Sequence, residues 1–217
     1  GMEDSTINGG VMLAAMCDRY AATGDPALRS AAHSIFRGLE LCGSLSSLPG
    51  FVLRSVSPFD RASYYIETSR DQVTHFVHGL WRYHRSPLST DGERARIRAL
   101  LAGVCALMEE RVVPANGYHI GKENGDPGVV DAMWDVMPHE ICRLPMVYAA
   151  GWQVTGNDRW QDQYRRYAEA AASGAGELDT GRYANVYPLF QHQVSLELLA
   201  AAETEDNALR TRWLELM

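Results

Sequence analysis

The chain has 217 residues, enough for one well-packed domain, and its content of 46% hydrophobic residues is that of an ordinary globular protein rather than a disordered one. Its 20 basic and 27 acidic residues give a net charge of −7, and the basic residues are scattered, which excludes a typical nucleic-acid-binding protein. No apolar run approaches the roughly 18–20 residues that a membrane-spanning helix needs.

The first helical hairpin is predicted over residues 9–43. Residues 10–22 are almost wholly apolar and end at Thr23-Gly24-Asp25-Pro26, where Asp25 caps a second helix and Pro26 suits its first position. Apolar residues then recur at helical spacing as far as Gly43.

A long connection, residues 44–68, follows and contains Pro49-Gly50 and a short β-like stretch at 51–56. Long connections in a helical array that carry charged and aromatic residues are frequent places for function. Arg54, Asp60 and Arg61 are therefore candidate cleft residues, with solvated loop charges as the alternative.

The second hairpin, residues 69–112, is marked by two capping boxes, which are Ser69 with Gln72 and Thr90 with Glu93. Turn signals then dominate residues 113–128 and favour a small β-hairpin around 118–120.

The third hairpin is predicted over 129–173, with helices at about 139–154 and 158–173, and Pro145 is expected to kink or delay the first of them. A further helix is expected from Asp126, as its cap, to Met137. The fourth hairpin covers residues 188–217, so the whole chain, 1–217, is expected to form a single α/α-hairpin domain.

The four cysteines lie far apart in apolar stretches, without a CxxC pair or metal-ligand spacing; they are Cys17, Cys42, Cys105 and Cys142. Buried free thiols are expected rather than disulfides or a metal site.

The start Gly1-Met2 is typical of a glycine left by tag cleavage ahead of an initiator methionine. This predicts a cytoplasmic protein, although removal of an export signal would leave the same start.

The helix junctions repeat one another in the segments AATGDPALRSAA, QVTGNDRWQDQYRRYAEAA and AETEDNALRT. Together with TSRDQVTHFVHGLWRYHR, this pattern resembles the six-hairpin glycosidase superfamily of (α/α)6 toroid proteins. The resemblance implies an all-α fold and a carbohydrate ligand. A closed toroid has six hairpins and this chain has about four. We therefore expect an incomplete toroid-like array whose open flanks are covered in a homodimer or by the remainder of a longer chain.

The helix from Arg70 to Arg85 carries a polar stripe of Asp71, His75, His78 and Arg82 within an arc of about 60°. Such a stripe can bind an anionic sugar or act as acid and base if it faces the concave side of the array. Alternatively, Asp71 interacts with the helix dipole and the histidines face water. A metal site at Asp71, His75 and His78 lacks an obvious further ligand.

A second group lies at residues 131–140, where helical spacing would place Asp131 and Asp135 on one face beside Trp134, with His139 and Glu140 after Pro138. Glycoside hydrolysis needs two carboxyl groups and is helped by an aromatic platform for the sugar. The alternative is that these acids are surface or capping groups.

A third group, Tyr183, Tyr187, Gln191 and His192, lies at the start of the last hairpin and could line a sugar cleft. The alternative places the tyrosine rings in the core with their hydroxyl groups at the surface. The remaining tryptophans, Trp81, Trp152, Trp160 and Trp213, occupy apolar helical positions and are expected in the core.

The leading hypothesis is a glycoside hydrolase-like protein that acts on a saccharide, or binds it, in a cleft at one end of the array. Asp71 and Asp135 are the preferred catalytic pair, and Glu140 is the alternative catalytic carboxylate. The expected substrate-binding residues are His75, His78, Arg82, Trp134, His139, Tyr183, Tyr187 and His192.

Two alternatives remain open at this point. One is a non-catalytic helical-repeat module that binds a saccharide or a protein. The other is a lyase or epimerase, which a histidine facing an arginine and a tyrosine without a carboxylate pair would favour. No cofactor is expected, because the sequence has no glycine-rich phosphate loop between a strand and a helix.

Overall fold

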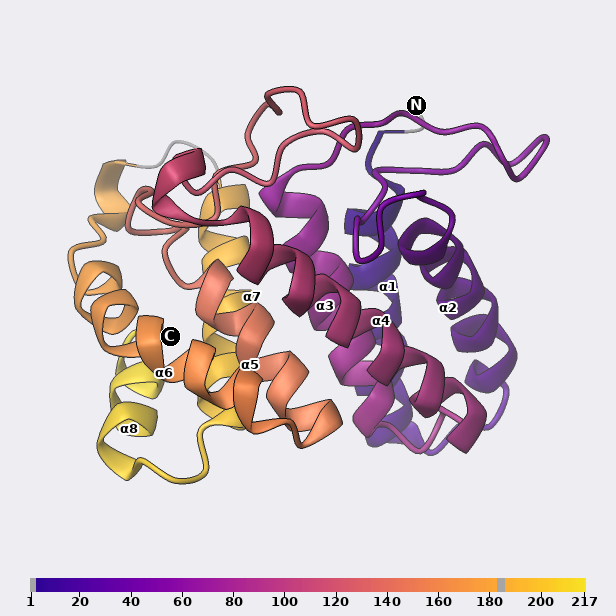
Figure 1. The fold of residues 1–217 in the computed structure, drawn as a ribbon. Helices are drawn as coiled ribbons and strands as arrows, with labels where there is room; N and C mark the ends of the chain where they lie inside the picture. The colour runs from indigo at the N-terminus through magenta and orange to yellow at the C-terminus, as the bar shows by residue number, and fades with distance from the viewer. Residues whose placement is uncertain (1–2, 183–185) are drawn as a thin grey trace.

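The computed structural model describes residues 3–182 and 186–217, and in these residues the protein is all-α, with eight α-helices and no strand (Figure 1). The helices form four hairpins in chain order. They are α1 (Ser5–Thr23) with α2 (Leu28–Ser44), α3 (Arg70–Arg85) with α4 (Asp91–Arg111), α5 (Arg143–Thr155) with α6 (Asp158–Ala175), and α7 (Tyr187–Ala202) with α8 (Asn207–Glu215). Two short 3₁₀ turns, Pro114–Asn116 and Thr180–Arg182, lie in the connections.

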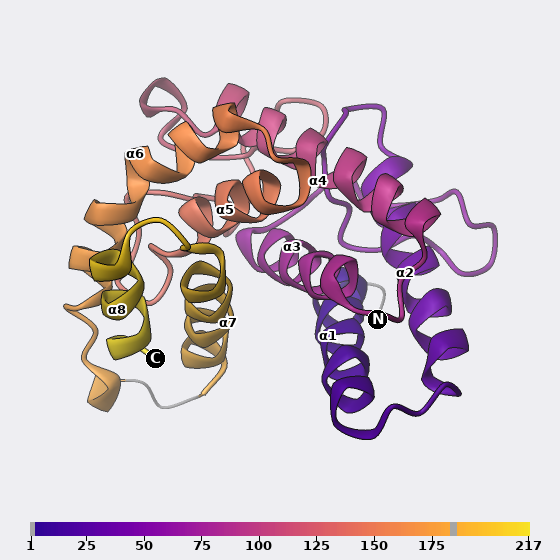
Figure 2. The ribbon, with the colours of Figure 1, turned by 90° about the horizontal axis from the view of Figure 1, so that it is seen from below.

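The hairpins build a curved array of two layers (Figure 2). The odd-numbered helices pack against one another along the inner layer, α1 on α3, α3 on α5 and α5 on α7, and α3 also contacts α7. The even-numbered helices cover the outside. The long connections that precede α3 and α5 lie at the end where these inner helices begin, at the top of Figure 1.

Side-chain caps begin four of the eight described helices, α3, α4, α6 and α8. Thr90 and Glu93 form the predicted capping box, and Ser69 Oγ accepts a hydrogen bond from the backbone N–H of Gln72 at 3.4 Å. The side chain of Gln72 does not return to Ser69 but reaches Thr6 and Asp4 near the start of α1. The predicted box at Ser69 is therefore only half formed.

Two of the three repeated junctions end their helices in the same way, whereas α7 ends before Glu203, which has an extended conformation. Gly24 and Gly156 both adopt left-handed conformations, with φ of 66° and 67°, and donate to the carbonyl oxygens of Tyr20 and Trp152. Because only glycine adopts this conformation without strain, the Thr-Gly pattern of the sequence predicts these turns well.

The core lies between the two layers and contains the four cysteines as free thiols, as predicted. Burial raises the pKa of each of these thiols. Trp81, Trp160 and Trp213 are buried, whereas Trp152 is only half-buried and packs at the edge of the core.

The connection between α4 and α5 differs from the prediction. No helix forms over 126–137, and α5 begins at Arg143 rather than near residue 139. Val130 and Asp135 adopt φ of 58° and 57°, which are incompatible with a helix. The β-like segments make only isolated bridges, Val56 with Tyr64 and His119 with Ala132.

None of the helices in the described ranges combines the length and the apolar character needed to cross a membrane.

Candidate functional site

A buried polar cluster lies where the first turns of α3, α5 and α7 meet, and Arg143 is at its centre. The guanidinium of Arg143 is 1% exposed, forms an ion pair with Asp71 of α3 and donates to the side-chain oxygen of Gln191 in α7. Its Nη2 also lies 3.7 Å from Oε1 of Glu140. Arg143 therefore ties three inner helices together.

Glu140 completes the charged part of this cluster from the loop before α5. Its Oε1 lies 2.6 Å from Nη2 of Arg70 and 3.5 Å from Nε2 of His139. Asp71 and Glu140 thus flank one guanidinium, and Glu140 is shared between two. We call the group formed by Arg70, Asp71, His75, His139, Glu140, Arg143, Gln191 and His192 the Arg143 cluster.

Two buried histidines of the Arg143 cluster, His75 and His192, are held in the neutral form at pH 7. Burial, with smaller effects from nearby positive charges, lowers the pKa of His75 to about 4 and that of His192 to about 4. Burial also lowers the pKa of His139. A neutral imidazole carries one hydrogen-bond donor and one acceptor, which suits it to uncharged hydroxyl groups.

Several buried polar atoms near the cluster have no hydrogen-bond partner of good geometry. In the described part of the chain there are seven such side-chain atoms, and all except Trp160 Nε1 lie in or next to the Arg143 cluster. They are Thr68 Oγ1, Arg70 Nε, His75 Nδ1, Arg143 Nε and both ring nitrogens of His192. Buried polar atoms are almost always paired in native proteins, so this concentration marks a place suited to a polar ligand.

Two aromatic side chains of α7 cover the cluster. Tyr187 is 40% exposed and Phe190 is 42% exposed. The Phe190 ring stacks on His75 with the ring centroids 5.5 Å apart. Burial and the charge of Asp71 raise the pKa of Tyr187 to about 12. An exposed aromatic surface therefore lies over His75 and within electrostatic range of Asp71 and Arg143.

Backbone strain is concentrated in the loops at this end of the array. The non-glycine residues with left-handed φ in the described ranges are Arg61, Tyr118, Val130 and Asp135, and all lie in the two connections that precede α3 and α5. Val130 is β-branched, for which this conformation is unfavourable, and its carbonyl accepts from the backbone N–H of Arg70 at 3.0 Å. Strain of this kind is most frequent at functional sites.

The structure brings together seven of the residues proposed from the sequence: Asp71, His75, His139, Glu140, Tyr187, Gln191 and His192. Tyr183, which was also proposed, lies outside the described residues.

His78 and Arg82 lie further along α3 and serve a different contact. Nε2 of His78 is 3.1 Å from Oε2 of Glu197 in α7, and Nη1 of Arg82 is 2.5 Å from Oε1 of the same residue. Arg82 also pairs with Asp18 of α1. The predicted polar stripe therefore faces neighbouring inner helices rather than water. Its second half, His78 and Arg82, connects α3 to α1 and α7.

The group at residues 131–135 is not arranged as predicted, because the segment is not helical. Asp131 is fully buried, where its oxygens accept from the backbone N–H of Gly121 and pair with Nδ1 of His119, both at 2.7 Å. Asp135 is exposed, and Trp134 is half-buried with its ring 4.7 Å from that of Tyr167. Asp131 and Asp135 therefore do not share a face beside Trp134.

The central residue, Arg143, was missed by sequence reasoning, as were Arg70 and Phe190. A signal for Arg143 did exist, because it is the one charged residue in the apolar run from Ile141 to Ala150. An arginine in such a run is buried only when a partner neutralises it.

Within residues 3–182 and 186–217, no three or more side chains of His, Cys, Asp or Glu are grouped so that they could hold a metal ion.

Comparison of the chain with known protein families, with curated proteins and with solved structures finds no match.

Proposed function

We propose that the chain binds a saccharide at the inner-layer end formed by α3, α5 and α7. Tyr187 and Phe190 would stack on the apolar face of a sugar ring, and Asp71 would accept hydrogen bonds from its hydroxyl groups. The observation that carries this proposal is the exposed pair of aromatic rings beside the Asp71–Arg143 ion pair. The neutral His75 ring stacked on Phe190 and the unpartnered polar atoms of the Arg143 cluster support it.

Binding is tested by a glycan array screen of the full chain, followed by calorimetric titration with the best glycan. Phe190→Ala and Asp71→Asn should each weaken binding about tenfold or more, because one removes the stacking surface and the other a charged acceptor. Phe59→Ala and Asp91→Asn are matched controls, since Phe59 is an exposed loop aromatic and Asp91 is an exposed aspartate in the first turn of α4. If the test and control variants bound the glycan with equal affinity, the proposed site would be wrong.

A second candidate function is glycoside hydrolysis by Asp71 and Glu140. It is favoured by one observation, that both carboxylates flank the guanidinium of Arg143, whereas Asp135 lies exposed in the preceding loop. The presence of this carboxylate pair favours hydrolysis over a lyase or epimerase reaction. Hydrolysis requires one carboxyl group to donate a proton and the other to act as base or nucleophile.

Hydrolysis is tested with a panel of 4-nitrophenyl glycosides. Asp71→Asn and Glu140→Gln are expected to lower kcat about 100-fold or more, and Asp135→Asn is expected to leave it unchanged. If Asp135→Asn lost activity while Glu140→Gln kept full activity, the catalytic pair would instead be Asp71 and Asp135, as expected from the sequence. If no glycoside is cleaved while glycan binding is retained, the protein is a binding module.

A further inference from the structure

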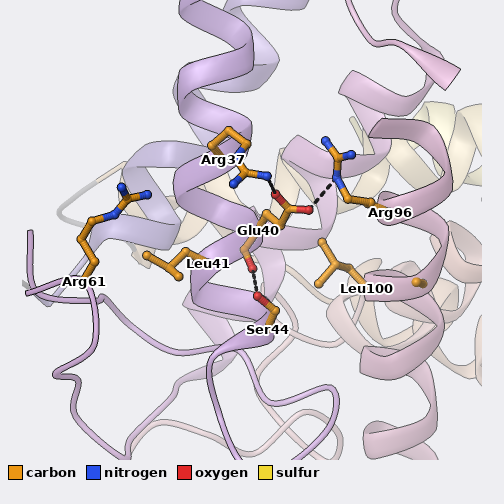
Figure 3. A pocket seen from close by; sticks show the side chains of 8 residues that line it. Arg37, Glu40, Leu41, Ser44, Arg61, Arg96 and Leu100 are labelled. Carbon is orange, nitrogen blue, oxygen red and sulfur yellow. Dashed lines mark hydrogen bonds and ion pairs between the residues drawn. The ribbon is translucent and has the colours of Figure 1, made fainter. Parts of the chain in front are cut away.

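A separate charged site lies in a pocket between α2 and α4, on other helices than the Arg143 cluster (Figure 3). The pocket has a volume of about 360 Å³, within the range that small-molecule sites occupy. Its lining combines charged and apolar side chains: Arg37, Glu40, Leu41 and Ser44 of α2, Arg96, Ala99 and Leu100 of α4, and Arg61 of the connection between α2 and α3.

The pocket carries a local excess of positive charge. Glu40 pairs with two of the arginines, through Oε2 to Nη1 of Arg37 at 2.7 Å and through Oε1 to Nε of Arg96 at 2.6 Å. Three guanidinium groups and one carboxylate leave a charge of +2 in a chain whose net charge is −7. The pairing also fixes the orientation of Arg37 and Arg96, each of which keeps further N–H donors for a ligand.

Arg61 is the uncompensated cation of this pocket. Its guanidinium has no ion pair or hydrogen bond among the described residues, and Figure 3 shows it on the opposite side of the pocket from Arg96. The neighbouring Asp60 forms no ion pair with Arg61 among the described residues; its carboxylate is turned toward the backbone N–H groups of Ala62 and Ser63 and the Ser63 hydroxyl, from which it accepts hydrogen bonds. Arg61 itself has a φ of 57° and donates its N–H to the carbonyl of Ser57 at 2.9 Å.

We infer that this pocket binds a phosphate monoester that carries a small apolar organic group. A phosphate monoester has a charge of about −1.5 to −2 at pH 7, which matches the charge of the pocket. Guanidinium groups bind phosphoryl oxygens with paired, charge-assisted hydrogen bonds. Leu41, Ala99 and Leu100 supply an apolar surface for the organic group.

The probe that tests this inference is phenyl phosphate, titrated into the full chain by calorimetry and by amide NMR. Saturable binding is expected, with shifts of residues in α2 and α4, and with at least about threefold higher affinity than for inorganic phosphate, because the phenyl ring buries apolar surface. Arg61→Asn should weaken binding about tenfold, since it removes a charge-assisted contact while asparagine tolerates the left-handed backbone. Arg61→Lys should retain most of the affinity.

Arg19→Asn, at an exposed position of α1, is the matched control and should bind as the unchanged protein does. The inference is overturned by an absence of saturable binding or by equal affinity of Arg61→Asn and the unchanged protein. Equal affinity for phenyl phosphate and inorganic phosphate would likewise overturn the assigned ligand class.

Discussion

Gly10 of α1 and Gly79 of α3 face each other where the two helices are in closest contact. A Cβ atom on Gly79 would lie 2.6 Å from Cα of Gly10, and a Cβ atom on Gly10 would overlap the carbonyl of His75. The first two inner helices can therefore pack this closely only because both positions lack a side chain. This contact holds α1 against the helix that carries Asp71 and His75.

Substitution of these glycines is expected to destabilise the protein. Gly79→Ala and Gly10→Ala should each lower the free energy of unfolding by about 2–3 kcal/mol, because backbone atoms must move to admit the methyl group. Gly38→Ala is the control in α2, where a Cβ would meet no atom within 4 Å; it should raise stability by roughly 0.5–1 kcal/mol. Urea unfolding measures the free energy of unfolding of all three variants. A change of the same sign in Gly38→Ala and Gly10→Ala would contradict the close packing at Gly10.

Arg143 is expected to be a main determinant of stability at the inner-layer end. In Arg143→Met the side-chain volume is roughly kept, but Asp71 and Glu140 lose their shared guanidinium, so the free energy of unfolding should fall by about 3 kcal/mol. The surface pair of Arg159 with Glu109 provides the comparison, because Arg159 is 60% exposed and Arg159→Met should cost less than about 1 kcal/mol. Similar unfolding midpoints for the two variants at pH 7 would be inconsistent with a structural ion-pair cluster.

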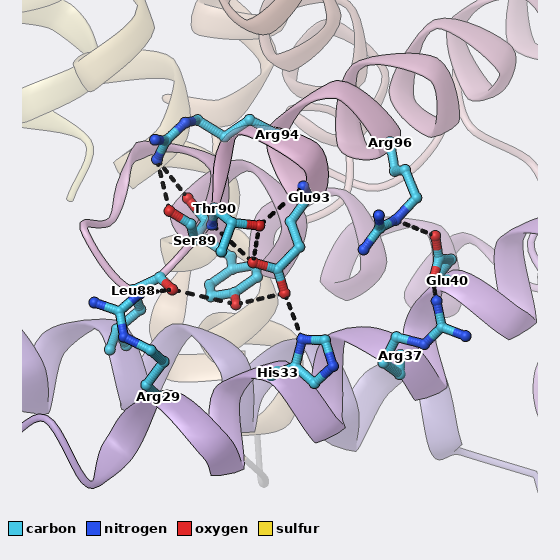
Figure 4. A network of polar contacts seen from close by, with 11 residues as sticks. Arg29, His33, Arg37, Glu40, Leu88, Ser89, Thr90, Glu93, Arg94 and Arg96 are labelled. Carbon is cyan, nitrogen blue, oxygen red and sulfur yellow. Dashed lines mark hydrogen bonds and ion pairs between the residues drawn. The ribbon is translucent and has the colours of Figure 1, made fainter.

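The Glu93 carboxylate should contribute stability that is lost in acid. Burial alone would raise its pKa, but hydrogen bonds from Thr90, His33 and Tyr83 outweigh burial and lower the pKa to about 2 (Figure 4). Because the unfolded chain takes up this proton near pH 4.5, the contribution is complete above that pH and disappears as the pH falls toward 2.

Glu93→Gln is therefore expected to cost about 2 kcal/mol at pH 7 and progressively less between pH 4.5 and 2. Urea unfolding at several pH values tests this, with Glu110→Gln, an exposed glutamate near the other end of α4, as the control. A stability difference between the unchanged protein and Glu93→Gln that stays constant down to pH 2 would argue against the ionised network.

His75 and His192 should make the protein sensitive to milder acid. Their folded pKa values of about 4 lie below the value of 6.5 for an unperturbed histidine, so the unfolded state binds these protons first. The stability from these two groups is complete above pH 6.5 and falls as the pH drops toward 4, by up to about 1.4 kcal/mol per pH unit for each ring.

The double variant His75→Gln with His192→Gln should flatten this dependence between pH 6.5 and 4, because glutamine does not titrate. Arg19→Asn serves as the control, since Arg19 is exposed and arginine does not titrate in this pH range. The measurement is the slope of the free energy of unfolding against pH, and an unchanged slope in the double variant would show that these rings are not buried in the neutral form.

Sequence reasoning located much of the inner-layer end without defining its chemistry. Asp71 and His75 were found from their spacing on one helix, and Tyr187 and His192 from their place at the start of another. Their proximity to one another was not predictable, because it depends on the packing of α3 against α7 and on Arg143 reaching both. Asp135 was assigned to the site on the assumption of a helix at 126–137, which does not form.

The sequence by itself determined the four helical hairpins, the capping residues Ser69 and Thr90 and the glycine turns at Gly24 and Gly156, because these features depend on interactions over three or four residues. The cap expected at Asp25 is wrong, because α2 begins after Ala27 without a side-chain cap. Only the tertiary structure decided the path of residues 113–142, where the buried Asp131 bonds to His119 and Gly121, which both lie outside the helix expected at 126–137. It also decided which charges meet at Arg143, since buried ion pairs between separate helices leave no periodic pattern in the chain.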